Sequence, residues 1–199
     1  MKKIIFDLDG TLTKEETLKV IARHFGLEKQ IDVLTERTVV GHIPFVESFI
    51  RRVHLLKGLP IDEVRELLSR VLLHDRVIQL ISDYSQDCCV ATGNLDVWVS
   101  GLVNKIGCEY YSSVAEVKDN KICSIRSILK KETIVDLFKD RGFQVVYIGD
   151  GNNDVEAMRR ADIAIASGLV HMPSNGVLSV ADYVVFSEEA LCRLIRQLL

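Results

Sequence analysis

Two acidic motifs, each at the end of an apolar run, have the residue types and the spacing to bind a cation and attack a bound ligand. The first is DLDGT at residues 7–11, which follows the apolar run at 3–6. Side chains two positions apart on a strand point the same way, so the spacing directs Asp7 and Asp9 to one spot at the strand tip. Open α/β sheets bind their ligands at these tips. An acidic strand end that enters a turn is the simpler alternative, but it accounts for the Asp-Gly pair alone.

The second motif is GDGNND at residues 149–154, directly after the apolar run VVYI. Its glycines permit tight backbone geometry, and Asn153 and Asp154 are good residues to open the helix that residues 155–160 predict. By itself Gly-Asp-Gly could be a simple turn. Together with the first motif it predicts two further carboxylates, Asp150 and Asp154, at a strand tip.

Convergence of these carboxylates would require a cation. Each like-charge pair near 4 Å repels by roughly 4 kcal/mol at an effective dielectric of about 20. Neither motif contains His or Cys, and every candidate ligand is a hard oxygen, which indicates Mg²⁺ rather than zinc. A divalent ion that also grips a phosphate fits this ligand set. The metal-ligand candidates are Asp7, Asp9, Asp150 and Asp154.

Thr92 and Lys131 are candidates for holding phosphoryl oxygens. The apolar run CCVA at residues 88–91 ends in Thr92-Gly93-Asn94, so a hydroxyl and a flexible backbone N–H stand at a third strand tip. Lys131 begins a predicted helix, and its ammonium could neutralise charge on a phosphate. A Thr-Gly turn and a solvated lysine are the alternatives, and Lys130 is a near rival of Lys131.

Short apolar runs, separated by segments of helical periodicity, must position these residues. The predicted strands are 3–6, 88–91, 110–112, 145–148, 163–166 and 183–186, and KDNK at 118–121 predicts a hairpin turn. Runs that are apolar on both faces are typical of a parallel sheet covered by helices on both sides. The sequence therefore predicts an α/β fold with a doubly wound parallel sheet.

One segment does not follow this alternation of strands and helices, because residues 14–73 predict several consecutive helices and no strand. Leu18, Ile21 and Phe25 keep the spacing of one helical face, and GLP at 58–60 ends a later helix. We expect residues 14–73 to form a small helical cap domain, and residues 1–13 and 74–199 to form the α/β core. Extra helices packed on one face of the sheet without a role are the alternative.

Composition favours a globular protein with a small-molecule partner. The 199 residues include 25 Lys and Arg against 28 Asp and Glu, without a basic block, so we expect no nucleic-acid and no membrane surface. No apolar stretch reaches the roughly 20 residues of a membrane span, and acidic residues interrupt the first apolar run too soon for a signal peptide. We expect a cytoplasmic monomer or homodimer. The five cysteines have no metal-like spacing and are expected to be free thiols.

The four motifs, in their order along the chain, resemble those of the haloacid dehalogenase superfamily of phosphatases. The match covers nearly the whole chain: DxD at residues 7–9, Thr92, Lys131, and GDxxxD at residues 149–154. The helical segment directly after the first motif is similar to the cap of the phosphoserine phosphatase-like subgroup. The resemblance implies a Rossmann-like phosphatase fold and Mg²⁺ as the cofactor.

The resemblance also implies roles for the motif residues. Asp7 would be the nucleophile that forms an aspartyl-phosphate, and Asp9 would act as general acid and then as general base. Thr92 and Lys131 would complete the catalytic set. The implied metal site consists of Asp7, Asp150 and the backbone carbonyl of Asp9, with Asp154 nearby.

Within the cap, the match places Glu16 where the subgroup holds the ammonium of the substrate, and Arg52 where it holds the carboxylate. A carboxylate suits an amine, and a guanidinium fork suits a carboxylate. Without the resemblance, Glu16 would be an acid at a helix N-terminus and Arg52 a solvated helix residue. Thr92, Gly93 and Asn153 are further substrate-binding candidates.

Two departures from the subgroup lie close to the organic part of the expected substrate. Thr92-Gly93-Asn94 stands where Ser-Gly-Gly is usual, and Val39 stands near a usual methionine. The substrate is therefore expected to be phosphoserine or a similar small phosphorylated metabolite, with a sugar phosphate or a salvage intermediate as the alternative. A phosphomutase of the same fold stays open as well. A binding module without catalytic activity is disfavoured, because all four motifs keep residues that are able to carry out the chemistry.

Overall fold

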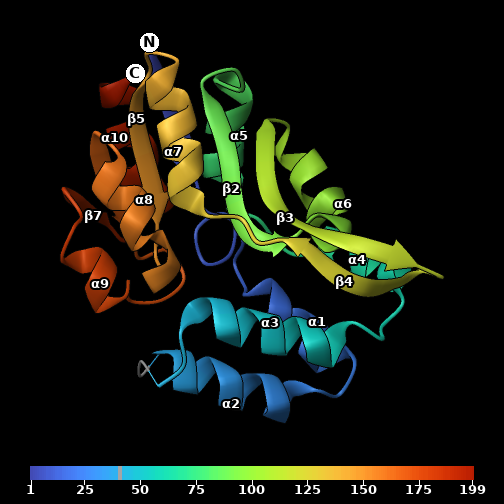
Figure 1. The fold of residues 1–199 in the computed structure, drawn as a ribbon. Coiled ribbons are helices and arrows are strands. Elements are labelled where there is room, and N and C mark those ends of the chain that lie inside the picture. The colour runs from blue at the N-terminus through green and yellow to red at the C-terminus, as the bar shows by residue number, and fades with distance from the viewer. Residues whose placement is uncertain (40–41) are drawn as a thin grey trace.

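A seven-stranded sheet forms the centre of the computed structural model, which describes residues 1–39 and 42–199 (Figure 1). The strand order is β4-β3-β2-β1-β5-β6-β7, and neighbouring strands are parallel except for antiparallel β3 and β4. The strands are β1 Lys2–Phe6, β2 Cys88–Leu95, β3 Glu109–Lys118, β4 Lys121–Ser127, β5 Gln144–Gly149, β6 Ile163–Ser167 and β7 Tyr183–Val185. All six predicted runs lie on strands, with only Phe186 beyond the end of β7. The predicted doubly wound α/β sheet is confirmed.

Alternate side chains of the central strands pack into two separate hydrophobic cores, one on each face of the sheet. Ile4 and Phe6 of β1 face one core and Ile5 faces the other, and all three are fully buried. Helices α5, α6 and α10 cover the first face, and α7 and α8 cover the second. The helices outside the 14–73 segment are α5 Asp75–Asp83, α6 Asp96–Ile106, α7 Lys131–Asp140, α8 Val155–Arg160, α9 Asn175–Leu178 and α10 Glu188–Leu198. Among the described residues, no helix has both the length and the apolar composition that crossing a bilayer needs.

The adjacent cysteines of β2 are part of these two cores. Cys88 belongs to one core and Cys89 to the other, and both side chains are buried. Burial raises the pKa of the Cys88 thiol to about 12, so it stays protonated and unreactive near neutral pH. All five cysteines are free thiols, as predicted.

Four helices occupy the segment between β1 and α5. They are α1 Thr17–His24, α2 Glu28–Val39, α3 Phe45–Leu56 and α4 Ile61–Ser69, and the described part of residues 14–73 contains no strand. The chain leaves and re-enters the core at one place, because Thr13 pairs with Leu73 in an antiparallel bridge and the N–H of Lys14 donates to Leu72 O at 2.8 Å. In Figure 1, α1, α2 and α3 lie beneath the sheet, on the side where β2 ends. This paired entry and exit supports the proposed division into a cap of residues 14–73 and a core of residues 1–13 and 74–199.

The predicted hairpin joins β3 and β4, and its turn reaches the helical segment. Asp119 and Asn120 adopt φ angles of 50° and 57°, a left-handed conformation that Asn and Asp tolerate better than most residues. The carbonyl of Asn120 accepts from the N–H of Ile61 at 2.9 Å, and the carbonyl of Lys57 accepts from the N–H of Ile122 at 3.2 Å. The hairpin is therefore bonded through the main chain to the junction of α3 and α4.

Candidate active site

The three central strands bring the predicted motifs to one edge of the sheet. β1 lies between β2 and β5, and these strands lead to Asp7, Thr92 and Asp150 respectively. The strand order reverses at β1, so the motifs stand at the topological switch point, where doubly wound sheets bind ligands. Strand register alone thus explains why residues distant in the sequence meet here.

Asp7, Asp150 and Asp154 form a buried acidic cluster. Each offers a carboxylate oxygen, and these oxygens all lie within 4.8 Å of one another. All three side chains are buried, and Thr11 Oγ1 donates to Asp150 Oδ1 at 3.0 Å. The arrangement can hold a hard cation.

Lys131, the first residue of α7, lies against this cluster. Its Nζ is 2.6 Å from Asp7 Oδ1 and 2.7 Å from Asp154 Oδ1, and the residue is only 3% exposed. Burial lowers the pKa of Lys131, but attraction to Asp154 and Asp7 raises it above its usual range. Lys130 is exposed. Of the two lysines that the sequence left open, Lys131 is therefore the one at the site.

Asp154 is held by four donors. Lys131 Nζ and the Tyr147 hydroxyl donate to Oδ1, the latter at 2.8 Å, while the N–H groups of Asp150 and Gly151 donate to Oδ2 at 3.1 and 3.0 Å. Gly149 permits this approach, since a Cβ there would lie 2.5 Å from Asp154 Cγ. Asp154 thereby fixes the loop that carries Asp150 and orients Lys131.

The electrostatics of the cluster fit a divalent cation. Burial, together with the charges of Asp154 and Asp150, raises the pKa of Asp7 well above its ordinary value, although Lys131 lowers it. Burial and the charge of Asp154 likewise raise the pKa of Asp150 to about 7. One lysine does not offset the cost of three buried carboxylates. Since the donors are all oxygens, the residues present fit Mg²⁺.

The side chain of Asp9 lies outside the cluster. β1 ends at Phe6, and Gly10 at φ 74° leads the chain into a turn, so strand alternation does not extend from Asp7 to Asp9. The Asp9 carboxylate instead accepts from the N–H of Thr17 at 2.7 Å. Burial and the charge of Glu16 raise the pKa of Asp9 to about 6, although the Thr17 hydrogen bonds lower it. The structure thus brings three of the four predicted carboxylates together and leaves Asp9 beside them in the same cavity.

Thr92, Gly93 and Asn94 lie near the end of β2, where the pairing with β3 shifts register between Thr92 and Leu95. Thr92 is 1% exposed, and its Oγ1 accepts from the N–H of Asn94 at 3.1 Å, which leaves the hydroxyl hydrogen free to donate. Asn94 Nδ2 donates to Thr17 Oγ1 at 2.6 Å. Asn94, which stands where the subgroup usually has glycine, therefore bonds the core to the first cap helix.

A cavity of about 640 Å³ opens between the sheet edge and the cap. Glu16 and Arg52 line it from the cap side, and Asn153 and Gly93 line it from the core side. The Arg52 guanidinium lies 5.8 Å from the centre of the Phe45 ring, and its Nε donates to Ser48 O at 3.4 Å. Burial lowers the pKa of Arg52 below its ordinary value, although the charges of Glu16 and Asp9 offset part of this effect. The predicted carboxylate-binding and ammonium-binding residues thus share one cavity with Asp7. The side chain of Val39 lies outside the described residues.

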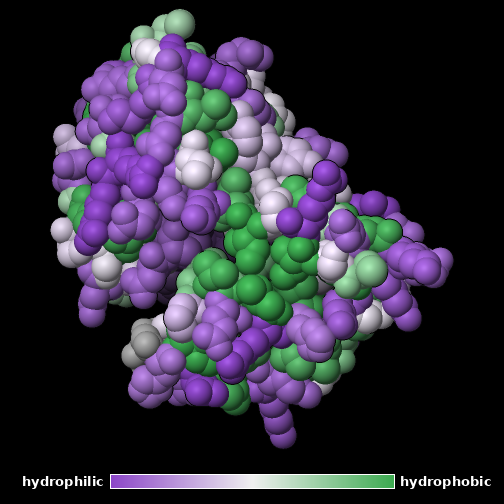
Figure 2. All heavy atoms as spheres, viewed as in Figure 1, coloured by the Kyte–Doolittle hydropathy of each residue, from purple (hydrophilic) through white to green (hydrophobic). Residues whose placement is uncertain are grey.

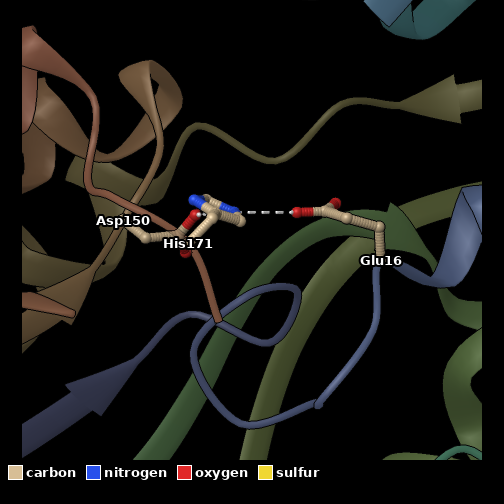
Figure 3. A group of neighbouring side chains, drawn as sticks. All are labelled: Glu16, Asp150 and His171. Atoms are coloured by element: carbon tan, nitrogen blue, oxygen red, sulfur yellow. Dashed lines mark hydrogen bonds and ion pairs between the residues drawn. The ribbon is translucent and has the colours of Figure 1, made fainter. Parts of the chain in front are cut away.

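His171 is a cavity residue that sequence reasoning missed. Figure 3 shows its ring between Glu16 and Asp150, with Nε2 3.3 Å from Glu16 Oε1 and 3.2 Å from Asp150 Oδ2. The hydrogen bond that His171 donates to Glu16 raises the pKa of His171 to about 9, against the effect of burial. Burial raises the pKa of Glu16, but His171, Lys19 and Arg52 bring it below its ordinary value. Val-His-Met at 170–172 matches no motif, so no sequence signal marked this residue.

Comparisons with known proteins point to one family. The profile of the haloacid dehalogenase-like hydrolases matches residues 4–159. The phosphoserine phosphatase of Methanocaldococcus jannaschii is 30% identical over 178 residues, which cover 83% of this chain and 84% of that protein. The phosphoserine phosphatase of Archaeoglobus fulgidus is 28% identical over 82% of this chain, but the chain spans only 51% of that protein. A solved phospho-aspartyl intermediate analogue of phosphoserine phosphatase is 27% identical, with a TM-score of 0.80 and full coverage of both chains.

Proposed function

Because the chain belongs to the haloacid dehalogenase-like hydrolase family and is a phosphatase of its phosphoserine phosphatase-like subgroup, we propose that it hydrolyses small phosphomonoesters with Mg²⁺ through an aspartyl-phosphate on Asp7. The observation that carries this proposal is the buried cluster of Asp7, Asp150 and Asp154 with Lys131. Three buried carboxylates beside a single ammonium leave an excess of negative charge, which a divalent cation would balance.

In the first step, a carboxylate oxygen of Asp7 attacks phosphorus. Within the described part of the chain, both donors to this carboxylate, the Leu8 N–H and Lys131 Nζ, reach Oδ1 at 2.7 and 2.6 Å, so Oδ2 keeps its lone pairs. A bond forms between Asp7 and phosphorus while the ester P–O bond breaks. The departing alkoxide takes a proton from Asp9, whose pKa of about 6 suits a general acid near neutral pH.

In the second step, water hydrolyses the aspartyl-phosphate. Asp9, now deprotonated, takes a proton from the water as its oxygen bonds to phosphorus, and the bond to Asp7 breaks to release inorganic phosphate. The chain returns to its starting state with Asp9 protonated. Asp9 lines the same cavity as Asp7, which is the placement that both proton transfers need.

Three groups stabilise the charge on the transferring phosphoryl group. Lys131 supplies a positive charge and Thr92 supplies a hydroxyl donor. The residues that would hold Mg²⁺ are Asp7, Asp150 and the backbone carbonyl of Asp9, with Asp154 as the anchor of the loop. When bound, the ion offsets negative charge on the phosphoryl oxygens.

Phosphoserine is the first substrate to test. The named relatives are phosphoserine phosphatases, and in this chain Glu16 and Arg52 line the cavity as a carboxylate and a guanidinium. Arg52 would bind the substrate carboxylate, and Asn153 and Gly93 would contact the ester. Residues 14–73 would act as the cap that closes over the substrate and excludes water.

The test is a phosphate-release screen over small phosphomonoesters, phosphoserine included, with Mg²⁺ and with a chelator. We expect release that requires Mg²⁺ and disappears in Asp7→Asn, while thermal melting shows that the variant stays folded. Release by Asp7→Asn at the wild-type rate would remove Asp7 from the mechanism. A phosphomutase would convert substrate without free phosphate, so the same screen separates the two activities.

A further inference from the structure

The contact between His171 and Glu16 uses the carboxylate that the family resemblance assigns to a substrate ammonium. Glu16 lies at the start of the cap, immediately before α1, and His171 lies in the core loop between β6 and α9. Figure 3 shows the His171 ring turned toward the Glu16 carboxylate across the cavity. The two side chains meet at 3.3 Å. A protein side chain therefore already occupies the partner position of Glu16.

Three acceptors surround the His171 ring. Nε2 faces the carboxylate oxygens of Glu16 and Asp150, and Nδ1 faces the carbonyl of Met172 at 3.1 Å. A ring nitrogen that faces an acceptor must carry a proton to bond to it. Since Asp150 is a candidate metal ligand, only the contact with Glu16 enters the inference below.

Two further cationic side chains lie near Glu16. Besides His171, the charges of Lys19 and Arg52 act on this carboxylate, and both residues line the same cavity. The carboxylates of Asp9 and Asp150 offset part of this charge, since Asp9 acts on Arg52 and Asp150 lies 3.2 Å from His171. An incoming ammonium would have to displace His171 from Glu16, whereas an ester without an amine would leave that contact in place.

We infer that His171 is a specificity-determining residue: it holds Glu16 in place of a substrate ammonium and biases the site toward carboxylate-bearing phosphate esters that lack an amine. The inference rests on the proposed function, because it concerns which small phosphomonoester fills the cavity. Phosphoserine can still bind, but its ammonium must compete with His171 for Glu16. The preferred substrate class is a small phosphorylated carboxylic acid.

The test compares two ligands that differ only in the amine: phosphoserine and 3-phosphonooxypropanoate, which has the same chain without the amino group. Affinities are measured by calorimetry with Mg²⁺ in Asp7→Asn protein, so the readout needs no turnover. We expect His171→Ala to raise the affinity for phosphoserine relative to its partner by about fivefold, the size of a partly exposed ion pair. In Glu16→Gln protein the same His171→Ala change should leave the ratio unaltered, since the two residues would act through one contact.

His24→Ala is the matched control. His24 pairs with Glu63 at the same 3.3 Å and with similar exposure, 46% and 52% against 44% and 33% for His171 and Glu16, but neither residue lines the cavity. This variant should not change the affinity ratio. An unchanged ratio in His171→Ala, an equal change in the Glu16→Gln background, or no measurable binding of either ester would overturn the inference. Failure of the proposed function has a different signature, namely no phosphate release by the wild-type protein from any ester.

Discussion

The ammonium nitrogen of Lys131 lies 2.6 Å from the Oδ1 atom of Asp7, and both residues are almost fully buried. Lys131 also contacts Asp154, so one cation links the candidate nucleophile to the residue that anchors the loop of Asp150. The position of the proposed nucleophile therefore depends on a residue from a different element, α7.

Replacement of Lys131 should affect both turnover and stability. We expect Lys131→Met to lower kcat by about 10²- to 10³-fold, because it removes a donor to the phosphoryl group. It should also destabilise the metal-free protein by about 3 kcal/mol, because two buried carboxylates lose their partner. Phosphate-release kinetics and urea unfolding measure the two effects. Lys130→Met, at the exposed neighbouring position, should change neither, and equal effects of the two variants would contradict the assignment.

The acidic cluster predicts how pH acts on the metal-free protein. Asp150 has a pKa of about 7 when folded, above its ordinary value, so the folded state binds the proton more tightly than the unfolded chain does. The stability that this group contributes is complete below about pH 4 and is lost as the pH rises through about 7. In chelator, the melting temperature should therefore fall between about pH 4 and about pH 7 and level off above that range. Mg²⁺ should reduce that fall, since it binds the ionised cluster.

Asp150→Asn is the check on this behaviour. Without the carboxylate, both the pH-dependent loss and the response to Mg²⁺ should shrink. Melting curves that fall equally with and without Mg²⁺ in the wild-type protein would show that the cluster does not bind the ion.

Arg52 should discriminate between esters by their carboxylate. We expect Arg52→Ala to lower kcat/KM for phosphoserine about 30-fold more than for phosphoethanolamine, which lacks the carboxylate, because truncation would leave the substrate charge unpaired in the cavity. Arg51 is the control, since it is about half exposed and pairs with Glu47 on the same helix. Arg51→Ala should affect both esters equally and slightly. Equal losses in Arg52→Ala would argue against a carboxylate-bearing substrate.

Gly149 should tolerate no side chain. A Cβ at this position would lie 2.5 Å from Asp154 Cγ, inside the buried cluster. Gly149→Ala should therefore cost about 1–3 kcal/mol in the free energy of unfolding and should lower turnover, because Asp154 must shift away from Lys131. Gly58→Ala is the control, since no atom would lie within 4 Å of the added Cβ, and urea unfolding should place it within about 0.5 kcal/mol of the wild type. A neutral Gly149→Ala variant would show that Asp154 can move freely.

Parallel-strand geometry explains which site residues the sequence could predict. Asp7, Thr92 and Asp150 each follow or end an apolar run, and adjacent parallel strands bring such positions together. The side chain of Asp9 was predicted to join this group of carboxylates but lies outside it. The reason is that β1 ends at Phe6, one residue before the motif. The alternation of a strand therefore predicts the position of Asp7 but not the direction of Asp9.

Residues that reach the site through tertiary packing could not be predicted in this way. Tyr147 reads as one more apolar strand residue, yet its hydroxyl donates to Asp154. His171 lies in a loop without a motif, and its contact with Glu16 joins residues 155 positions apart in the chain. The first contact depends on packing within the core and the second on how the cap sits on the core, and no local pattern specifies either.

The main-chain bonds between the β3–β4 hairpin and the helical segment also restrict how the cap can open. Asn120 and Lys57 accept hydrogen bonds across this junction, and Figure 1 shows the hairpin at the opposite side of the molecule from α9, which follows His171. A cap fastened at the hairpin cannot lift away evenly. We expect the cap to rotate about the hairpin, so that its largest displacement is on the opposite side, where Glu16 meets His171. The contact proposed to select ligands would then be the last part of the cavity to close after a ligand has entered.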